Sequence, residues 1–383
     1  MTKVTELSSD AYCDLFIPND TSRLLIDFCS NHKSVFIFGA GKIGKGMKHF
    51  LEQCDVPVNG FVTTDTFQKF KQAYKQGEAG LIIGLSDKFL DDVTPMINSI
   101  VCKKDLFLPD CEYRENIGSN FSVEIKRDNL IIVPHITSHC NLNCKYCRTF
   151  SPVSRPDFYE LGEFVKDIKQ LKKLNLPIKE FVLSGGEPLL HPNLFEMLRE
   201  SRECFPNTTI KCITNGILLK LLNNKQLKEL LDLDIIVQIT KYPNVTGAIE
   251  SFCAKAGDIK YNIATYEKHK QFVSDKLDMR GIAPKYDFYN CVANRDSGNL
   301  ILMFGKLYNC ATPAHVCYLN ERFKTDFQVR AGDFIDIYNT TPEDIYNFKI
   351  SRTPFCDYHD SANRLFVDWG VSDRKVEEWV HFE

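Results

Sequence analysis

Apolar and polar positions in the first third of the chain alternate between short strands and amphipathic helices. Short apolar runs bounded by turn residues predict buried strands, which lie at 35–39, 58–63, 81–86 and 105–109. Apolar residues at helical spacing between these runs predict helices, which lie at 42–53, 66–76 and 86–100. Strands that alternate with helices are typical of a parallel sheet, so residues 33–112 are predicted to form a small doubly wound α/β domain.

A second α/β series follows a mostly polar linker at 113–125. Its predicted strands lie at 129–137, 180–186, 209–216, 234–240 and 257–264, and its predicted helices at 159–175, 194–205 and 218–232. This order predicts a parallel sheet, curved into a partial (β/α)6 TIM-like barrel over residues 126–285. Active sites of such folds lie at the carboxyl ends of the strands. Residues that follow each strand are therefore the first candidates for function.

The flanking segments have weaker patterns. Residues 1–32 mix turn formers with one short apolar stretch and carry no motif. Residues 286–360 are more irregular, contain several cysteines, and are predicted to form a C-terminal domain of their own. The tail, residues 361–383, includes an amphipathic pattern at 371–380 that predicts a short helix.

Composition and charge are those of an ordinary globular protein. Of the 383 residues, 44% are hydrophobic and 25% are charged, and the length suggests two or three compact units. The formal net charge of -3 provides no basic field for nucleic acid or an anionic membrane, so neither is expected as a partner. The sequence shows no signal segment and no run of about 18 apolar residues, which predicts a cytoplasmic location.

Fifteen cysteines are many for a chain predicted to lie in the reducing cytosol, where thiols serve metals or chemistry and disulfides are rare. One set lies mostly in apolar strand or helix patterns and is predicted to belong to the core. These residues are Cys13, Cys29, Cys54, Cys102, Cys111, Cys204, Cys212 and Cys253. The remaining cysteines fall into two groups, and each group predicts a metal site.

Cys140, Cys144 and Cys147 form a CxxxCxxC loop directly after the predicted strand at 129–137. Three thiolates at this spacing can bind three irons of a [4Fe-4S] cluster and leave the fourth iron open, which is the property of a catalytic metal site. A zinc knuckle or a ferredoxin cluster is the alternative. Either would need a fourth ligand at close spacing, whereas the next cysteine is Cys204.

The residues around this loop resemble the radical S-adenosylmethionine (SAM) superfamily in their order and spacing. Asn141 and Leu142 give the family's usual CNL form, and Tyr146 holds the place of an aromatic residue that packs the adenine. Ser184–Pro188 matches the family's GGEP segment after the second strand. The resemblance covers roughly residues 126–285. It implies SAM contacts from Gly185, Gly186, Glu187, Pro188, Thr214, Asn215, Gln238 and Thr240.

The same resemblance implies a specific chemistry. The open iron would chelate the methionine part of SAM, and Glu187 would help to anchor its ammonium group. One electron would then cleave SAM to a 5′-deoxyadenosyl radical that abstracts hydrogen from a substrate. The expected cofactors are a [4Fe-4S] cluster with SAM, and an electron donor such as flavodoxin or ferredoxin is an expected partner.

The second group of cysteines resembles twitch and SPASM domains, which carry an auxiliary [4Fe-4S] cluster in many radical SAM enzymes. Cys291, thirteen residues, Gly305, four residues and Cys310 fit the C-x9-15-G-x4-C opening of these domains. The CxxC that closes a twitch domain corresponds here to Cys356 and His359, with histidine in place of the last cysteine. The resemblance therefore implies a second cluster in residues 286–360.

The last ligand of this auxiliary cluster is open. His359 holds the position of the motif and is the favoured ligand, and a neutral histidine would raise the potential of the cluster as in Rieske centres. Cys317, seven residues after Cys310, is the other candidate, although its surroundings predict a helix face. Buried structural thiols are the simpler alternative to a cluster.

Gly39, Gly41 and Gly44 form a GxGxxG segment between the first predicted strand and helix, which is the context of a nucleotide-binding loop. Amides at the start of that helix could bind a phosphate. NAD is not expected, because the second strand ends in 62–64 without an acidic residue. The domain resembles Rossmann-like modules of bacterial sugar-nucleotide and surface-polysaccharide enzymes, which implies a nucleotide-linked sugar. A scaffold with a tight glycine turn is the alternative.

Together, these features predict an enzyme that cleaves SAM reductively and abstracts hydrogen from a small polar substrate, a sugar or nucleotide-sugar. Oxidation, epimerisation and elimination are the open outcomes. Within enzymes, peptide modification is the alternative, because SPASM and twitch proteins also act on ribosomal peptides. Outside enzymes, the alternatives are an iron–sulfur electron carrier and a zinc-binding protein.

Overall fold

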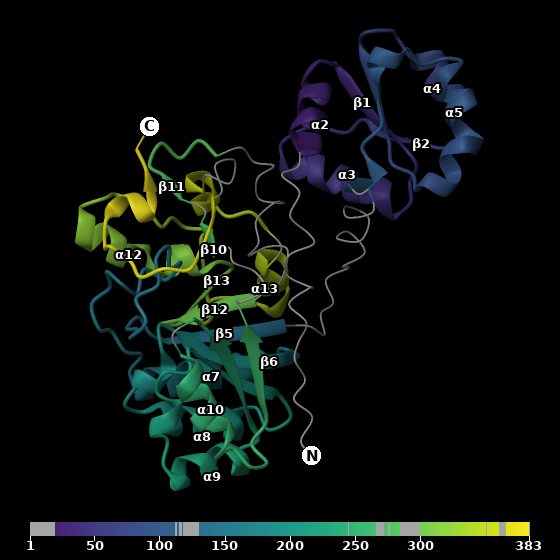
Figure 1. Cartoon of the computed structure of the whole chain (residues 1–383). Coiled ribbons are helices and arrows are strands. Elements are labelled where there is room, and N and C mark those ends of the chain that lie inside the picture. The colour runs from purple at the N-terminus through teal and green to yellow at the C-terminus, as the bar shows by residue number, and fades with distance from the viewer. Residues whose placement is uncertain are drawn as a thin grey trace. The chain divides into compact units, whose positions relative to one another are not determined.

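The computed structural model describes residues 20–111, 113, 114, 117, 130–243, 245–265, 272–274, 276–283, 299–349, 351–359 and 365–382. The chain divides into two compact units, and the small unit spans residues 17–126. The described part of the large unit begins at residue 130 and ends at residue 382 (Figure 1). Cys13, predicted to belong to the core, and Cys291, predicted to be a cluster ligand, lie outside the described residues.

The small unit contains a four-stranded parallel sheet in the order β2-β1-β3-β4. Its strands are β1 (Ser34–Phe38), β2 (Gly60–Val62), β3 (Ala79–Ile83) and β4 (Leu106–Phe107). Its helices include α3 (Lys42–Gln53), α4 (Phe67–Ala73) and α5 (Leu90–Asn98). The predicted strand–helix order is confirmed. α4 ends earlier than predicted because Tyr74 is extended, which lets its hydroxyl donate to Asp105 at 2.7 Å.

One helix of the small unit was not predicted. α2 (Asp20–Ser30) lies in a segment without a motif, yet its Leu25 and Cys29 are buried. Phe28 contacts the Phe107 ring at a centroid distance of 5.3 Å, and His32 Nε2 lies 3.3 Å from Asp105 Oδ1. α2 therefore belongs to the core of this unit.

The large unit is built on an eight-stranded sheet in the order β14-β13-β12-β5-β6-β7-β8-β9. Its strands are β5 (Leu130–Thr137), β6 (Ile178–Gly185), β7 (Thr209–Thr214), β8 (Ile235–Lys241), β9 (Tyr261–Thr265), β12 (Asn299–Met303), β13 (Lys306–Tyr308) and β14 (Ile335–Asp336). Strands β12 through β9 in this order are parallel, and β13 and β14 pair antiparallel at one edge. The predicted α/β class is confirmed.

β12 is one of the strands that the sequence pattern did not predict. It comes from residues 286–360, which were expected to form a separate domain, but it pairs in parallel with β5, with Leu300 opposite Ile132. Pairing between distant segments leaves no trace in local periodicity. The C-terminal region thus shares a sheet with the predicted barrel.

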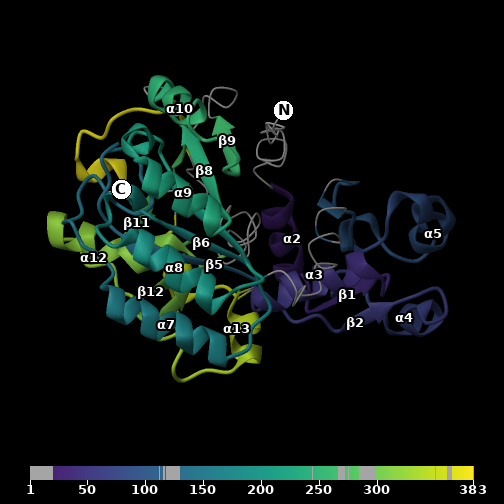
Figure 2. The same ribbon diagram turned by 90° about the horizontal axis from the view of Figure 1, so that it is seen from below.

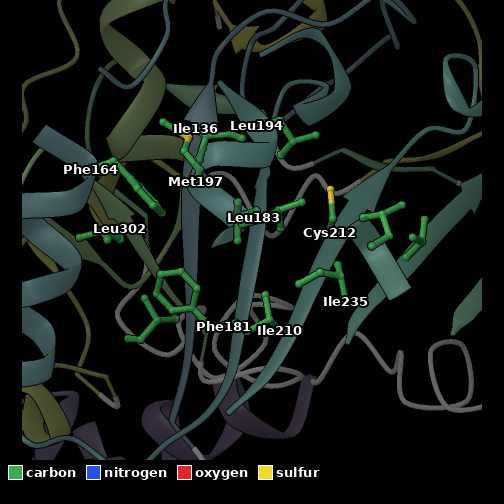
Figure 3. Packing of buried hydrophobic residues seen from close by; sticks show 14 of the residues in the cluster. Ile136, Phe164, Phe181, Leu183, Leu194, Met197, Ile210, Cys212, Ile235 and Leu302 are labelled. Atoms are coloured by element: carbon green, nitrogen blue, oxygen red, sulfur yellow. The ribbon is translucent and has the colours of Figure 1, made fainter. Parts of the chain in front are cut away.

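Four helices cover one face of this sheet: α7 (Leu161–Lys173), α8 (Leu194–Cys204), α9 (Asn224–Asp232) and α10 (Thr246–Cys253). Figure 2 shows α7, α8 and α9 over the sheet. Alternate strand residues such as Phe181, Leu183 and Ile210 point toward them and are fully buried with Met197 (Figure 3). Cys204 and Cys212 also lie in this core, as the sequence predicts.

The opposite face has an apolar part and a polar part. Near β12, β5 and β6, Val133, Val182 and Ile301 pack with Ala314 of α12 (Ala311–Phe323). Toward β7 and β8, Lys211 Nζ pairs with Glu180 Oε2 at 2.6 Å. Half-buried Gln238 and Thr240 belong to this side, because Val237 and Ile239 between them face the helices.

Shorter elements complete the large unit: β10 (Phe272–Ser274), β11 (Leu277–Asp278), α13 (Pro342–Lys349), β15 (Leu365–Val367) and β16 (Val380–His381). The helix predicted at 371–380 does not form. Only Val376–Glu378 makes a helical turn, of the 3-10 type, and Val380 pairs with Leu277. Its apolar positions serve strand pairing and core packing instead. No helix within the described ranges is long and apolar enough to cross a membrane.

Candidate active site

The cysteine loop follows β5 at the carboxyl edge of the parallel strands. Asn143, Tyr146 and Phe150 have positive φ angles of 55°, 59° and 54°, so the chain turns tightly around the three thiols. Burial raises the pKa of Cys140 to about 11 and that of Cys144 to about 12. The neighbouring thiols raise both values further, which places the three cysteines within electrostatic reach of one another.

Each sulfur of the loop has a polar partner. Asn215 Nδ2 donates to Cys140 Sγ at 3.7 Å, and Trp369 Nε1 donates to Cys144 Sγ at 3.2 Å. Cys147 Sγ lies 3.2 Å from the Thr149 hydroxyl. Such donors favour the thiolate, which is the form that binds iron. The loop therefore fits a [4Fe-4S] cluster, in which each of the three cysteines binds a different iron. A site for a single metal ion is a different arrangement, and no three His, Cys, Asp or Glu side chains in the described ranges form one.

The glycines of the GGEP segment are required where the segment crosses the cysteine loop. Gly185 has a φ of 128°, and a Cβ there would lie 2.4 Å from the Thr137 carbonyl oxygen. A Cβ on Gly186 would lie 2.0 Å from the His139 carbonyl oxygen. Gly186 N donates to that Thr137 oxygen at 2.6 Å, and Glu187 N donates to His139 O at 2.7 Å. Only glycine allows this close backbone packing.

Glu187 is fully buried and its carboxylate is held by the chain itself. Oε1 accepts from Leu189 N at 3.1 Å and from the Thr214 hydroxyl at 2.8 Å, and Oε2 accepts from Asn215 N at 2.8 Å. Burial raises the pKa of Glu187, and these three donors partly offset that shift. The geometry favours a positioning role, in which Glu187 fixes Asn215, over direct anchoring of a ligand ammonium.

The other expected SAM contacts lie at the strand ends. Asn215 Nδ2 also donates to Asn141 Oδ1 at 2.8 Å, so this residue links the end of β7 to the cysteine loop. Pro188 begins a 3-10 turn and is buried. Tyr146 is half-buried, with the Lys145 ammonium 5.9 Å from its ring centre. Gln238 and Thr240 lie on the polar side of the sheet described above.

The sequence pattern missed the residues that cover the loop from the C-terminus. Trp369 bonds to Cys144, and Trp379 Nε1 donates to the Cys147 carbonyl oxygen at 3.0 Å. The Tyr242 hydroxyl also donates to Cys144 and lowers the pKa of that thiol against the effect of burial. The one available signal was the rarity of tryptophan, since the chain has two and both lie in residues 361–383.

In the second group, the structure brings Cys310 and His359 together. Cys310 caps the start of α12, and Cys356 lies in the turn Pro354–Tyr358 directly before His359. Burial raises the pKa of Cys310, but the hydrogen bond and charge of His359, together with the charge of Arg148 and the Thr312 hydroxyl, bring the value to about 7. Cys317 is exposed on α12 and its environment includes Arg155 and Asp157 instead.

A buried histidine pair joins the two cysteine regions and was also missed. His135 Nδ1, on β5, lies 2.7 Å from His315 Nε2, on α12. Burial lowers the pKa of both, that of His135 to about 4, so both are neutral at pH 7. The pair ties the strand that leads to Cys140 to the helix that begins at Cys310.

The glycine segment of the small unit is explained largely by packing. Gly39 has a φ of 107°, and a Cβ on Gly44 would lie 1.9 Å from the Gly39 carbonyl oxygen. A Cβ on Gly41 would meet no atom within 4 Å. Asp65, the first acidic residue after β2, is exposed. These contacts require two of the three glycines without invoking a ligand.

A parallel α/β sheet that presents three clustered, hydrogen-bonded thiols at its carboxyl edge offers three ligands for an iron–sulfur cluster. Residues 135–248 match the family described as the Radical SAM superfamily. This segment contains the whole cysteine loop, the GGEP segment and the ends of β7 and β8. The chain therefore contains a segment similar to radical SAM proteins, which use a [4Fe-4S] cluster with SAM.

The chain is also similar to individual proteins over part of its length. The chain is 36% identical over 94 residues to an AdoMet-dependent heme synthase of Methanosarcina barkeri, covering 23% of this chain and 25% of that protein. It is 33% identical over 84 residues to a GTP 3′,8-cyclase of Chlorobaculum tepidum, covering 22% and 25%. The chain thus spans about a quarter of these relatives. The crystal structure of BtrN in complex with AdoMet and 2-DOIA matches with 18% identity and a TM-score of 0.39, covering 59% of this chain and 83% of that one.

Proposed function

We propose that this protein is a radical SAM enzyme whose first cluster is held by Cys140, Cys144 and Cys147. The observation that carries the proposal is the contact network of the loop. The GGEP backbone bonds to the residues before Cys140, and Asn215 bonds to Cys140 and Asn141. The segments that resemble SAM-binding motifs therefore contact Cys140 and the residues beside it.

The bound cluster and SAM supply the chemistry, because one electron from a donor such as flavodoxin or ferredoxin cleaves SAM to methionine and a 5′-deoxyadenosyl radical. The residues of the chain position these groups. Asn215 holds Cys140, and Glu187 in turn holds the Asn215 amide. Gln238 and Thr240 offer polar groups on the side of the sheet away from the helices.

The proposed substrate is a small polar molecule, a sugar or nucleotide-sugar. The support is the polar part of the sheet, where the Lys211–Glu180 pair and two polar β8 side chains line one face. A relative is named GTP 3′,8-cyclase, and a Cβ on Gly41 in the small unit would meet no atom within 4 Å. Oxidation, epimerisation and elimination remain the candidate outcomes.

The second proposed element is an auxiliary [4Fe-4S] cluster bound by Cys310, Cys356 and His359, with Cys291 as the remaining ligand. The hydrogen bond between Cys310 and His359 supports it. Such a cluster could accept the electron of the substrate radical, which would complete a net oxidation. His359 would be its neutral ligand.

Two measurements test the proposal. Anaerobic reconstitution of the whole chain should give about eight irons if both clusters form. Replacing Cys140, Cys144 and Cys147 with alanine should remove about four irons and abolish 5′-deoxyadenosine formation. Cys54→Ala is the matched control, because Cys54 lies in the small unit, and it should keep both. Unchanged 5′-deoxyadenosine in the triple variant would refute the proposed site.

A further inference from the structure

The backbone of the cysteine loop is held by residues 368–379, which we name the C-terminal strap. Lys145 N donates to Gly370 O at 2.8 Å, and Ser372 N donates to Asn143 O at 2.9 Å. These bonds flank an antiparallel bridge between Cys144 and Val371. The loop therefore gains a strand partner at its central cysteine, more than 200 residues away in sequence.

Side chains reinforce this pairing. Lys145 Nζ lies 2.9 Å from Asp373 Oδ2, and an Arg374 guanidinium nitrogen lies 3.3 Å from Asn143 Oδ1. Within the strap, the buried carboxylate of Glu378 accepts from the Ser372 hydroxyl and from Asp373 N, both at 2.7 Å. The strap thus has a defined shape of its own and a charged contact with the loop.

Both tryptophans of the chain lie in the strap, and both indole N–H groups bond to the cysteine loop. Trp379 is buried among aromatic side chains, with ring centres 6.2 Å from Phe150 and 6.2 Å from Phe323, and donates to a backbone oxygen. Trp369 is half-buried and donates to a sulfur. Both tryptophans contact the cysteine loop. Of the two, Trp369 alone donates to an atom that would bind iron, the Cys144 sulfur.

The indole N–H is a donor without an acceptor function. In the strap, the Trp369 indole directs this donor at the Cys144 sulfur at 3.2 Å, a contact that filling space does not require. Hydrogen bonds to the sulfurs of an iron–sulfur cluster, together with exclusion of solvent, are among the factors that set its reduction potential. A donor to a thiolate ligand stabilises the more negative, reduced cluster.

We propose that the C-terminal strap is part of the first cluster site, and that Trp369 raises the reduction potential of that cluster by donating to the Cys144 sulfur. Trp369 is a positioning and tuning residue, since it acts through a ligand of the cluster. The inference rests on the proposed function for the existence of the cluster. Beyond that function, it assigns Trp369 as a residue that sets the reduction potential of the first cluster.

The test compares Trp369→Phe with Trp379→Phe in the reconstituted full-length protein. Midpoint potentials come from redox titration followed by electron paramagnetic resonance, and the first cluster is identified by the change in its signal when SAM is added. Trp369→Phe keeps a ring but removes the donor, so the midpoint should become more negative. Trp379→Phe removes a donor to backbone and should leave the midpoint near the wild-type value.

Equal midpoints in the wild-type protein and Trp369→Phe would overturn the inference. Failure of the wild-type protein to form any SAM-responsive cluster would instead refute the proposed function, so the two failures are distinguishable. A third variant, Trp369→Tyr, retains a hydroxyl donor. Its midpoint should lie between those of the wild-type protein and Trp369→Phe.

Fluorescence provides a readout that is independent of the potential. In Trp379→Phe, Trp369 is the sole tryptophan, and its emission should lose most of its intensity when the cluster assembles a few ångströms away. Emission that keeps its apo-protein intensity after reconstitution would contradict the placement of the strap. The same measurement on Trp369→Phe reports on Trp379 at the other end of the strap.

Discussion

The two cysteine regions of the large unit are assembled in different ways. The first has its three thiols on one short loop, and each sulfur has a polar partner. In the second, Cys310 at the start of a helix contacts His359, which directly follows a turn that contains Cys356 much later in the chain. Residues that share one loop can be grouped from the local sequence, whereas residues that folding brings together can be grouped only from their contacts.

The largest predicted effect that separates the two cysteine regions is the loss of iron when His359 is replaced. His359→Ala should lower the iron content of the reconstituted protein from about eight to about four per chain, because His359 lies against Cys310 and would be a cluster ligand. Cys317→Ala is the matched control and should keep the full content, since Cys317 is exposed elsewhere on α12. Iron and sulfide analysis measures both.

The reverse result, with iron lost from Cys317→Ala and kept by His359→Ala, would exchange the two candidates. His359→Cys offers a further check. A thiolate in place of the neutral imidazole should retain the iron and lower the midpoint potential of the auxiliary cluster.

The second prediction concerns the scaffold of the first region. Glu187→Gln replaces an oxygen acceptor with an amide NH2 that would face donors of the chain, so the free energy of unfolding should fall by about 3 kcal/mol. SAM affinity should weaken too, because Asn215 loses its support. Urea unfolding of the apo-protein and SAM titration calorimetry measure the two effects.

Glu180→Gln is the matched control for Glu187→Gln. Glu180 lies on the same strand, but it is half-buried and pairs with a lysine, so its loss should cost less than about 1 kcal/mol. Equal losses in the two variants would mean that the bonds of Glu187 have no special role in the site.

The smallest predicted effect tests the link between the two regions. His135 is buried with a pKa of about 4, below its ordinary value of 6.5, so the unfolded chain binds more protons than the folded chain between these values. Stability should therefore fall as the pH drops from 6.5 toward 4. For His135 alone, the loss is about 2 kcal/mol between pH 7 and pH 5.

Urea unfolding of the wild-type protein and of the double variant His135→Gln/His315→Gln at these two pH values measures the link. The double variant should lose much of this pH dependence. An identical dependence in both proteins would show that other groups cause it. The single variants should not be additive, because the two rings contact each other.

Local features of the sequence predicted much of the fold and of the first site. The strands and helices around Cys140–Cys147 follow from apolar periodicity, whereas the roles of the thiols and of the GGEP glycines come from the resemblance to the radical SAM superfamily and stay predictions. The partners of Glu187 and the bond from Trp369 to Cys144 could not be predicted, because each joins segments that approach only after folding. The sequence could not decide between His359 and Cys317 as the last cluster ligand for the same reason.

The tail gives a second case in which tertiary contacts override a local pattern. Residues 371–380 have a helical distribution of apolar positions, but Trp379 and Val380 are buried in a cluster with Phe150 and Leu277. Leu277 N donates to Trp379 O at 2.7 Å. This packing and pairing replace the helix that periodicity alone predicts.

The parallel pairing of β12 with β5 has a consequence for how this protein could be divided or recombined. A protein cut after residue 285 would expose the edge of β5 together with Val133 and Val182, which pack beside Ile301 in the whole chain. An open, apolar strand edge favours aggregation. The C-terminal region therefore cannot be transferred to another protein by itself. A chimera that contains it also needs a first strand that can pair with β12 as β5 does.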